Sequence, residues 1–100
     1  MSWAKYAKET LKKGLDAAVK PRGSSMKPKI ESGDVVTIAP CDPFRLKVDD
    51  IVLVTVKGKD YLHLIKAVDS KRFLIGNNRG GINGWVGWNS IHGKAVEVSK

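Results

Sequence analysis

The segment Pro21-Arg22-Gly23-Ser24-Ser25-Met26-Lys27-Pro28 divides the chain into a helical part and a β-rich part. It places two hydroxyl groups between a flexible glycine and two prolines, residues that favour turns and loops. Loops held by a rigid scaffold often carry functional side chains. We therefore expect this segment to be a loop that presents a serine hydroxyl, which becomes a nucleophile only when a base accepts its proton.

The residues before this loop have the periodicity of an amphipathic helix. Apolar residues recur at helical spacing, and charged residues fill the opposite face, among them Lys5, Lys8, Lys12 and Lys13. Pro21 disfavours helix at the residue before it, so we expect the helix to end at Val19 or Lys20. Its apolar face is compatible with packing on the domain, on a partner or on a bilayer surface. We predict a basic amphipathic helix over residues 1–20 and a β domain over residues 21–100, in a single compact unit.

The residues after the loop are predicted to form short strands separated by turns. The expected strands are Val35–Ala39, Ile51–Val56, Tyr61–Val68, Phe73–Ile75, Trp85–Trp88 and Ile91–Val98. Lys57-Gly58-Lys59-Asp60 supplies a hairpin turn, and residues 76–84 form a loop rich in Gly and Asn. We expect a mainly β fold, in which a coiled, barrel-like antiparallel sheet follows one N-terminal helix.

Length and cysteine content limit the class of protein. One hundred residues suffice for a single domain with a modest core. Cys41 is the only cysteine, so an internal disulfide is excluded and a reducing, cytoplasmic compartment is the default expectation. The longest apolar run, Ile51–Val54, has the length of a strand, so no transmembrane segment is expected.

The net charge is +8, and it is concentrated near the N-terminus. Residues 1–29 contain eight Lys or Arg residues and two acidic ones. Such a segment favours a solvated helix face. The alternative is a weak contact with phosphate or with anionic lipid at a membrane surface, through Lys5, Lys8, Lys12 and Lys13. A nucleic-acid-binding barrel is disfavoured, because the aromatic residues are not interleaved with basic ones as base stacking requires.

The search for a base leads to Lys66. In a regular strand over residues 61–68, a period of two places four side chains on one face, namely Leu62, Leu64, Lys66 and Val68. Aliphatic neighbours disfavour the charged form of a lysine, and a neutral amine can deprotonate serine. A lysine that snorkels past its neighbours and stays charged is the alternative. His63 falls on the opposite face from Lys66, so a histidine-based triad with Ser25 is not expected.

Metal chemistry is not predicted from this sequence. His63, His92 and Cys41 lack the short paired spacing that metal ligands usually show. We therefore expect no metal and no cofactor.

Several ordered motifs resemble those of the Ser/Lys peptidases, the group of bacterial type I signal peptidases and LexA-type self-cleaving repressors. Gly23-Ser24-Ser25-Met26-Lys27-Pro28 is similar to their nucleophile motif, in which the serine directly precedes Met, and this points to Ser25. Ile65-Lys66-Ala67-Val68 resembles the segment with the general-base lysine. The other similar segments are Ser32-Gly33-Asp34-Val35-Val36, Asp49-Asp50-Ile51-Val52, Gly76-Asn77-Asn78-Arg79, and Gly84-Trp85-Val86 with residues 91–95. Ordered motifs over about residues 22–98 are more specific than any one of them.

The resemblance implies a small signal-peptidase-like serine endopeptidase that cleaves a protein or peptide substrate in extended conformation. It assigns Ser25 as the nucleophile and Lys66 as the base. It also implies that two segments support the oxyanion and the active-site loops. The first contributes Gly23, Ser24 and Met26, and the second contributes Asn77 and Asn78.

The chain also departs from the family's pattern. Gly23 replaces a serine whose hydroxyl helps to bind the oxyanion in many signal peptidases, and Asn77 replaces an Asp. The loop over residues 76–84 is short and lacks the family's Asp-Ser-Arg element. We expect neither the hydrophobic anchor of the signal peptidases nor the DNA-binding domain of the repressors. The alternative function is a catalytically silent binding module, recruited by its basic helix to nucleic acid, a membrane surface or a protein partner.

Overall fold

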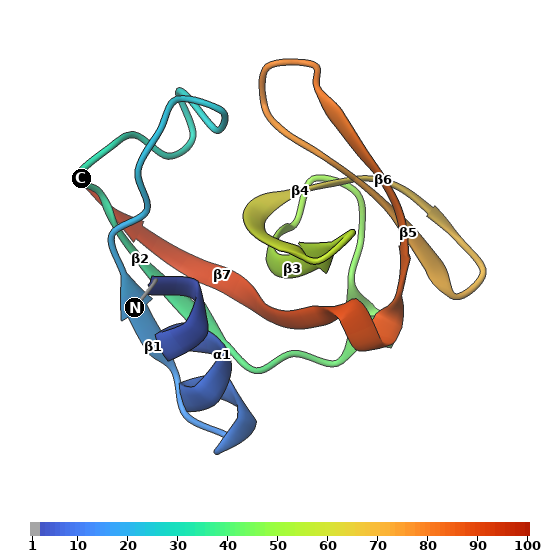
Figure 1. Ribbon diagram of the computed structural model, residues 1–100, viewed down its shortest axis with the longest axis horizontal. Coiled ribbons are helices and arrows are strands. Elements are labelled where there is room, and N and C mark those ends of the chain that lie inside the picture. The colour runs from blue at the N-terminus through green and yellow to red at the C-terminus, as the bar shows by residue number, and fades with distance from the viewer. Residues whose placement is uncertain (1–2) are drawn as a thin grey trace.

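The computed structural model describes residues 3–100, which form one curled sheet with a helix packed against it (Figure 1). The elements are α1 (Trp3–Lys12), β1 (Ala17–Val19), β2 (Val35–Ala39), the 3-10 helix η1 (Pro43–Arg45), β3 (Ile51–Val56), β4 (Lys59–Asp69), β5 (Arg72–Gly76), β6 (Ile82–Gly87), the 3-10 helix η2 (Trp88–Ser90) and β7 (Ile91–Ser99). The strand order is β1-β2-β7-β3-β4-β5-β6, with every neighbouring pair antiparallel. The predicted mainly β fold with one N-terminal helix is confirmed.

The helix is shorter than the sequence predicts. It ends at Lys12, and Gly14 has a φ of 79°, a conformation typical of residues that follow a helix. Ala17–Val19 instead form β1, which pairs with β2. The prediction of helix up to Val19 or Lys20 was wrong, because these residues take their backbone hydrogen bonds from a strand distant in sequence. The first two residues of the predicted helix lie outside the described part of the chain.

The helix and the sheet share one core. Ala4, Ala7 and Leu11 on α1 are buried together with residues of the sheet, including Val36, Ile38, Leu53, Leu62 and Leu64. Gly93 of β7 allows this close approach, because a Cβ there would lie 2.9 Å from Leu11 Cδ1 and 2.8 Å from Ala39 O. Residues before and after position 20 therefore contribute to the same core.

A second group of buried residues fills the other side of the central strands. It consists of Leu46, Val52, Val54, Val56, Ile65, Phe73, Ile75 and Ile91. Neighbours along β3 alternate between the two groups, with Leu53 in the first and Val52 and Val54 in the second, as the period of a strand requires. The middle of the sheet is thus buried on both faces, which gives β4 a rigid position.

Each predicted strand corresponds to a strand of the structure, and two of the predicted strands have the same first and last residues as observed. β2 and β3 have the predicted bounds. β4 begins earlier, at Lys59, and β6 begins at Ile82, inside the predicted loop, because Ile82 pairs with Gly76. Trp88 belongs to η2 and not to a strand. Among residues 3–100, no helix has the length and apolarity needed to cross a membrane.

Candidate active site

Ser25 lies in the connection between β1 and β2. Two turns shape this loop, since Lys27 N–H donates to Ser24 O over 3.2 Å and Ile30 N–H donates to Met26 O over 3.0 Å. Met26 and Ile30 are buried in the first core group and anchor the loop, while Ser24 is exposed and Ser25 is half-buried. The buried anchors hold the Ser25 hydroxyl at the surface in a fixed place.

The connection between β5 and β6 supports this loop from one side, and the two segments lie next to each other in Figure 1. Asn78 N–H donates to Ser25 O over 2.9 Å, and Asn78 Nδ2 donates to Lys27 O over 2.9 Å. Asn77 shapes its own turn, because its Oδ1 accepts the N–H groups of Arg79 and Gly81, each over 2.8 Å. Asn78 thus joins the two loops directly.

Two other contacts hold the ends of the Ser25 loop. Gly23 N–H donates to Ser32 Oγ over 3.0 Å. Lys100 Nζ donates to Asp34 Oδ2 over 2.8 Å and to Lys29 O over 3.2 Å. The hydrogen bond from Lys100, with that from the backbone of Glu31, lowers the pKa of Asp34 below its ordinary value. The C-terminal end of the loop is therefore tied to Lys100, the residue that follows β7.

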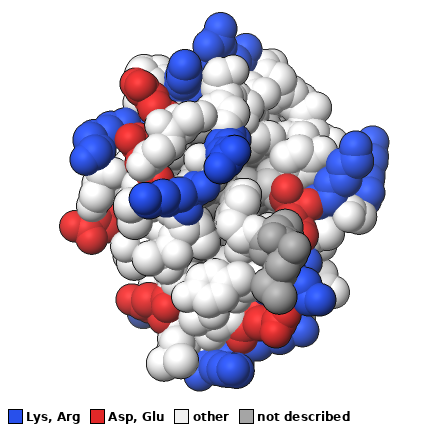
Figure 2. All heavy atoms as spheres, turned by 60° about the vertical axis from the view of Figure 1, so that its left-hand side comes forward, with Lys and Arg blue, Asp and Glu red and all other residues white. Residues whose placement is uncertain are grey.

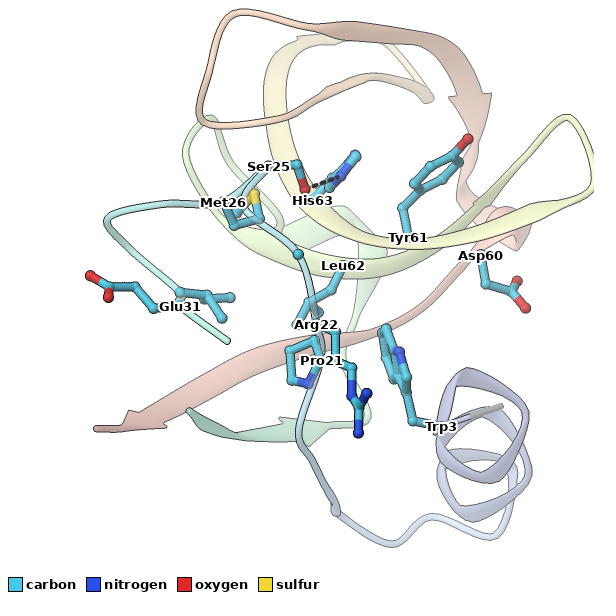
Figure 3. A pocket seen from close by; sticks show the side chains of 12 residues that line it. Trp3, Pro21, Arg22, Ser25, Met26, Glu31, Asp60, Tyr61, Leu62 and His63 are labelled. Carbon is cyan, nitrogen blue, oxygen red and sulfur yellow. Dashed lines mark hydrogen bonds between the residues drawn. The ribbon is translucent and has the colours of Figure 1, made fainter. Parts of the chain in front are cut away.

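His63 of β4 is the side chain that contacts the Ser25 hydroxyl. Its Nε2 lies 3.3 Å from Ser25 Oγ (Figure 3). The ring is buried, and it stacks on Tyr61 with the ring centroids 4.8 Å apart. Its Nδ1 lies 2.8 Å from Oδ1 of Asn83 on β6. An amide oxygen accepts only, so Nδ1 carries the hydrogen and the lone pair of Nε2 faces Ser25.

The environment of His63 favours its neutral form. Burial lowers the pKa of the imidazole, and the hydrogen bond with Asn83 opposes this effect without cancelling it. A neutral imidazole whose Nε2 faces a serine can accept the serine proton. Ser25, His63 and Asn83 therefore have the arrangement of a nucleophile, a base and a group that orients the base.

The prediction that excluded a histidine beside Ser25 was wrong. His63 does lie on the opposite face of β4 from Leu62, as strand alternation requires (Figure 3). However, the Ser25 hydroxyl lies on the His63 side of the strand. Alternation predicts the face of each side chain but not the face that a distant loop covers.

Lys66 occupies a different position. The pairing of β4 with β5 shifts between Ile65 and Ala67, so Lys66 is the extra residue of a β-bulge and not part of a regular strand. It is half-buried, and its Cγ lies 3.0 Å from where a Cβ of Gly76 would be. Within residues 3–100, no hydrogen bond joins Lys66 to Ser25. The assignment of Lys66 as the base stays a prediction, and no described contact supports it.

The sequence analysis missed His63, the partner of Ser25, and Asn83, the partner of His63. His63 interrupts an aliphatic run between Leu62 and Leu64, and a polar side chain in a buried strand is a signal for a specific role. No comparable feature of the sequence points to Asn83. Its contact with His63 depends on how β6 pairs with β5 in the folded sheet.

A cleft of about 220 Å³ runs beside Ser25 and His63 (Figure 3). Its lining is mixed, with the apolar side chains of Trp3, Pro21, Met26, Ile30 and Leu62 beside polar and charged ones. On the β4 side, Lys59–His63 pair with β3, whereas the pairing of β4 with β5 begins at Leu64. The other edge of this stretch pairs with no strand of the described chain and can accept an extended peptide.

A second histidine lies in a structural network near the cleft. His92 Nε2 is 2.7 Å from Thr55 Oγ1, which donates its proton to Asp60 Oδ1 over 2.6 Å. Asp60 also forms an ion pair of 2.9 Å with Lys8 of α1. The Thr55 hydroxyl is thus not poised as a nucleophile, and Lys8 is engaged within the protein. Among residues 3–100, no three His, Cys, Asp or Glu side chains are grouped to hold a metal ion.

Comparison with models of protein families shows which family the chain belongs to. The family described as Peptidase S24-like matches residues 3–82. The chain belongs to the Peptidase S24-like family. Membership confirms the resemblance to the Ser/Lys peptidases. The matched residues of this peptidase family include Ser25, His63 and Lys66, and the match ends one residue before Asn83. Searches of curated proteins and of solved structures found no significant match.

Proposed function

We propose that this Peptidase S24-like protein is a serine endopeptidase in which Ser25 is the nucleophile and His63 is the general base. The distance of 3.3 Å between Ser25 Oγ and His63 Nε2 carries this proposal. The contact of His63 with Asn83 supports it, because it leaves Nε2 free of hydrogen. Family membership supports a protein or peptide as the substrate.

The proposed reaction follows from these three side chains. His63 Nε2 takes the hydroxyl proton while Ser25 Oγ attacks the carbonyl carbon of a peptide bond. The imidazolium then gives this proton to the leaving amine, and the acyl group stays on Ser25. Water attacks the acyl-enzyme, again with His63 as the base, and releases the acid and the free serine.

The oxyanion of this reaction needs hydrogen-bond donors. Gly23 brings no side-chain hydroxyl, so backbone N–H groups must serve. Within residues 3–100, the N–H groups of Ser24 and Ser25 have no hydrogen-bond acceptor. They are our candidates for this role.

The substrate is proposed to bind as an added strand. The unpaired edge of Lys59–His63 ends at His63, and the cleft opens beside it. A peptide on this edge forms main-chain hydrogen bonds and places alternate side chains in the cleft. Its carbonyl groups then pass Ser25, which lines the same cleft.

Four variants test the proposal. Reaction with a fluorophosphonate probe and cleavage of a pool of short synthetic peptides, followed by mass spectrometry, report on Ser25. We expect Ser25→Ala and His63→Ala to lose about a thousandfold or more of the activity. Lys66→Ala and the control His92→Ala should stay within about threefold. All four variants are compared at equal folded fraction, measured by circular dichroism.

Two outcomes would overturn the assignment. Loss of activity in Lys66→Ala with full activity in His63→Ala would move the base to Lys66, as the motif resemblance implies. A wild-type protein that neither reacts with the probe nor cleaves any peptide would instead support the silent binding module.

A further inference from the structure

The loop segment that carries Ser25 and forms one wall of the cleft is rich in basic residues. Residues 20–29 contain four cationic side chains, Lys20, Arg22, Lys27 and Lys29, and no acidic one. All four are exposed, and within residues 3–100 none of them forms an ion pair. Positive charge that the protein does not neutralise attracts a negatively charged ligand to this wall.

Arg22 is the one cation of these four that lines the cleft. Its side chain extends past Pro21 toward the end of the cleft where Trp3 lies (Figure 3). A guanidinium group presents a planar set of donors that matches a carboxylate. Arg22 lies three residues before Ser25 in the sequence, and both residues line the cleft. One extended peptide in the cleft can therefore contact both.

The acidic residues of the cleft do not offset Arg22. Asp60 is already paired with Lys8 over 2.9 Å and accepts a hydrogen bond from Thr55. The Glu31 carboxylate points away from the middle of the cleft in Figure 3. Over the wider surface in this region, blue side chains are spread among red ones and form no single patch (Figure 2). Among residues 3–100, Arg22 and Glu31 thus both line the cleft without an ion pair, and Arg22 is the cation of the two.

We infer that Arg22 is a specificity-determining residue that binds a carboxylate of an acidic, extended peptide, while the apolar lining takes a neighbouring apolar side chain. This inference rests on the proposed function for the fate of the bound peptide, but binding itself requires no turnover. It defines the substrate class as protein segments that contain Asp or Glu next to the cleaved region.

Capture of peptides by an inactive protein tests the inference. Ser25→Ala protein is immobilised, a pool of short synthetic peptides of random sequence is passed over it, and the retained peptides are identified by mass spectrometry. The same experiment uses Ser25→Ala with Arg22→Glu and, as a control, Ser25→Ala with Arg45→Glu. Arg45 is also exposed, has no ion pair among residues 3–100 and does not line the cleft. The two double variants have the same net charge.

We expect Asp and Glu to be enriched about fivefold in peptides retained by Ser25→Ala, the factor that about 1 kcal/mol gives for a partly exposed ion pair. The Arg45→Glu control should retain this preference, and Arg22→Glu should lose it or favour Lys and Arg. Equal capture of acidic and neutral peptides, or equal losses in the two double variants, would overturn the inference.

Cleavage of the same pool by the wild-type protein separates the two proposals. If the wild type cleaves peptides without regard to charge, the inference about Arg22 fails and the peptidase stands. If it cleaves none while the immobilised protein still selects acidic peptides, the peptidase fails and the binding preference stands.

Discussion

His63 donates its Nδ1 hydrogen to Oδ1 of Asn83 over 2.8 Å, so an amide and not a carboxylate orients the proposed base. The amide fixes the tautomer of the ring but carries no charge. The imidazolium that forms during the reaction is therefore stabilised less than it would be beside an Asp. Burial adds to this effect, because it lowers the pKa of His63.

Asn83→Asp should make His63 more basic. A carboxylate next to Nδ1 favours the imidazolium, so the pKa of His63 should rise and kcat should increase about tenfold. The base works only when neutral, so the acid limb of the pH–activity profile should also move to higher pH. NMR titration of the His63 ring and the pH dependence of kcat/KM measure the two effects.

Asn89→Asp is the matched control, because it adds the same charge at an exposed residue outside the site. Its titration curve and its activity should equal those of the wild type. An unchanged His63 titration in Asn83→Asp would show that the contact with residue 83 does not govern the base.

Stability should fall in two steps as the pH decreases. Burial lowers the pKa of both His63 and His92 in the folded protein. The unfolded chain then binds protons more readily, so the free energy of unfolding should decrease below about pH 6.5 and level off below the folded pKa values. The pKa values of Asp34 and Asp50 are also lowered, so their contribution is lost at still lower pH, below about 3.8.

Urea denaturation at a series of pH values between neutrality and strong acid measures both steps. His92→Gln should reduce the upper step and leave the lower one unchanged, because glutamine has no charge to gain. A free energy of unfolding that stays constant between pH 7 and pH 5 would contradict the expected role of the buried histidines.

Local sequence patterns predicted much of the fold and only part of the site. Short apolar runs bounded by turn residues located Val35–Ala39 and Ile51–Val56 with their bounds. The loop with Ser25 was recognisable from its glycine, serines and prolines. The helix end could not be predicted, because Ala17–Val19 gain a strand partner that is distant in sequence.

The sequence analysis assigned Lys66 as the base, whereas the structure supports His63. This difference too arises from contacts between residues that are distant in sequence. A regular strand places Lys66 with Leu64, but the β-bulge at Lys66 interrupts this regularity. The partner of Ser25 depends on which face of β4 its loop covers, and that follows from the path of the whole chain. Sequence motifs pointed to Ser25 as the proposed nucleophile, whereas the neighbour of its hydroxyl became visible only in three dimensions.

Asn78→Ala should weaken the support of the Ser25 loop. The variant keeps the backbone hydrogen bond from residue 78 to Ser25 O but loses the one from Asn78 Nδ2 to Lys27 O. One such bond contributes about 1 kcal/mol. We expect kcat to fall about fivefold and KM to change little, because the loop positions the nucleophile and not the substrate. Steady-state kinetics on a peptide that the wild type cleaves measures both constants.

Asn89→Ala is the control for this variant, since it removes an exposed amide away from the loop. An equal fall of kcat in both variants, or none in Asn78→Ala, would show that the contact with Lys27 has no part in positioning Ser25.

Leu11→Ala tests whether α1 belongs to the folded domain. Leu11 is buried against the sheet beside Gly93, and its truncation leaves a cavity that the backbone cannot fill. We expect the free energy of unfolding to fall by about 2 to 4 kcal/mol. Tyr6→Ala, on the exposed side of the same helix, should change it by about 0.5 kcal/mol or less. If α1 instead bound a membrane or a partner protein and did not pack on the sheet, neither side chain would contribute to the core. Both substitutions would then change the free energy of unfolding equally little.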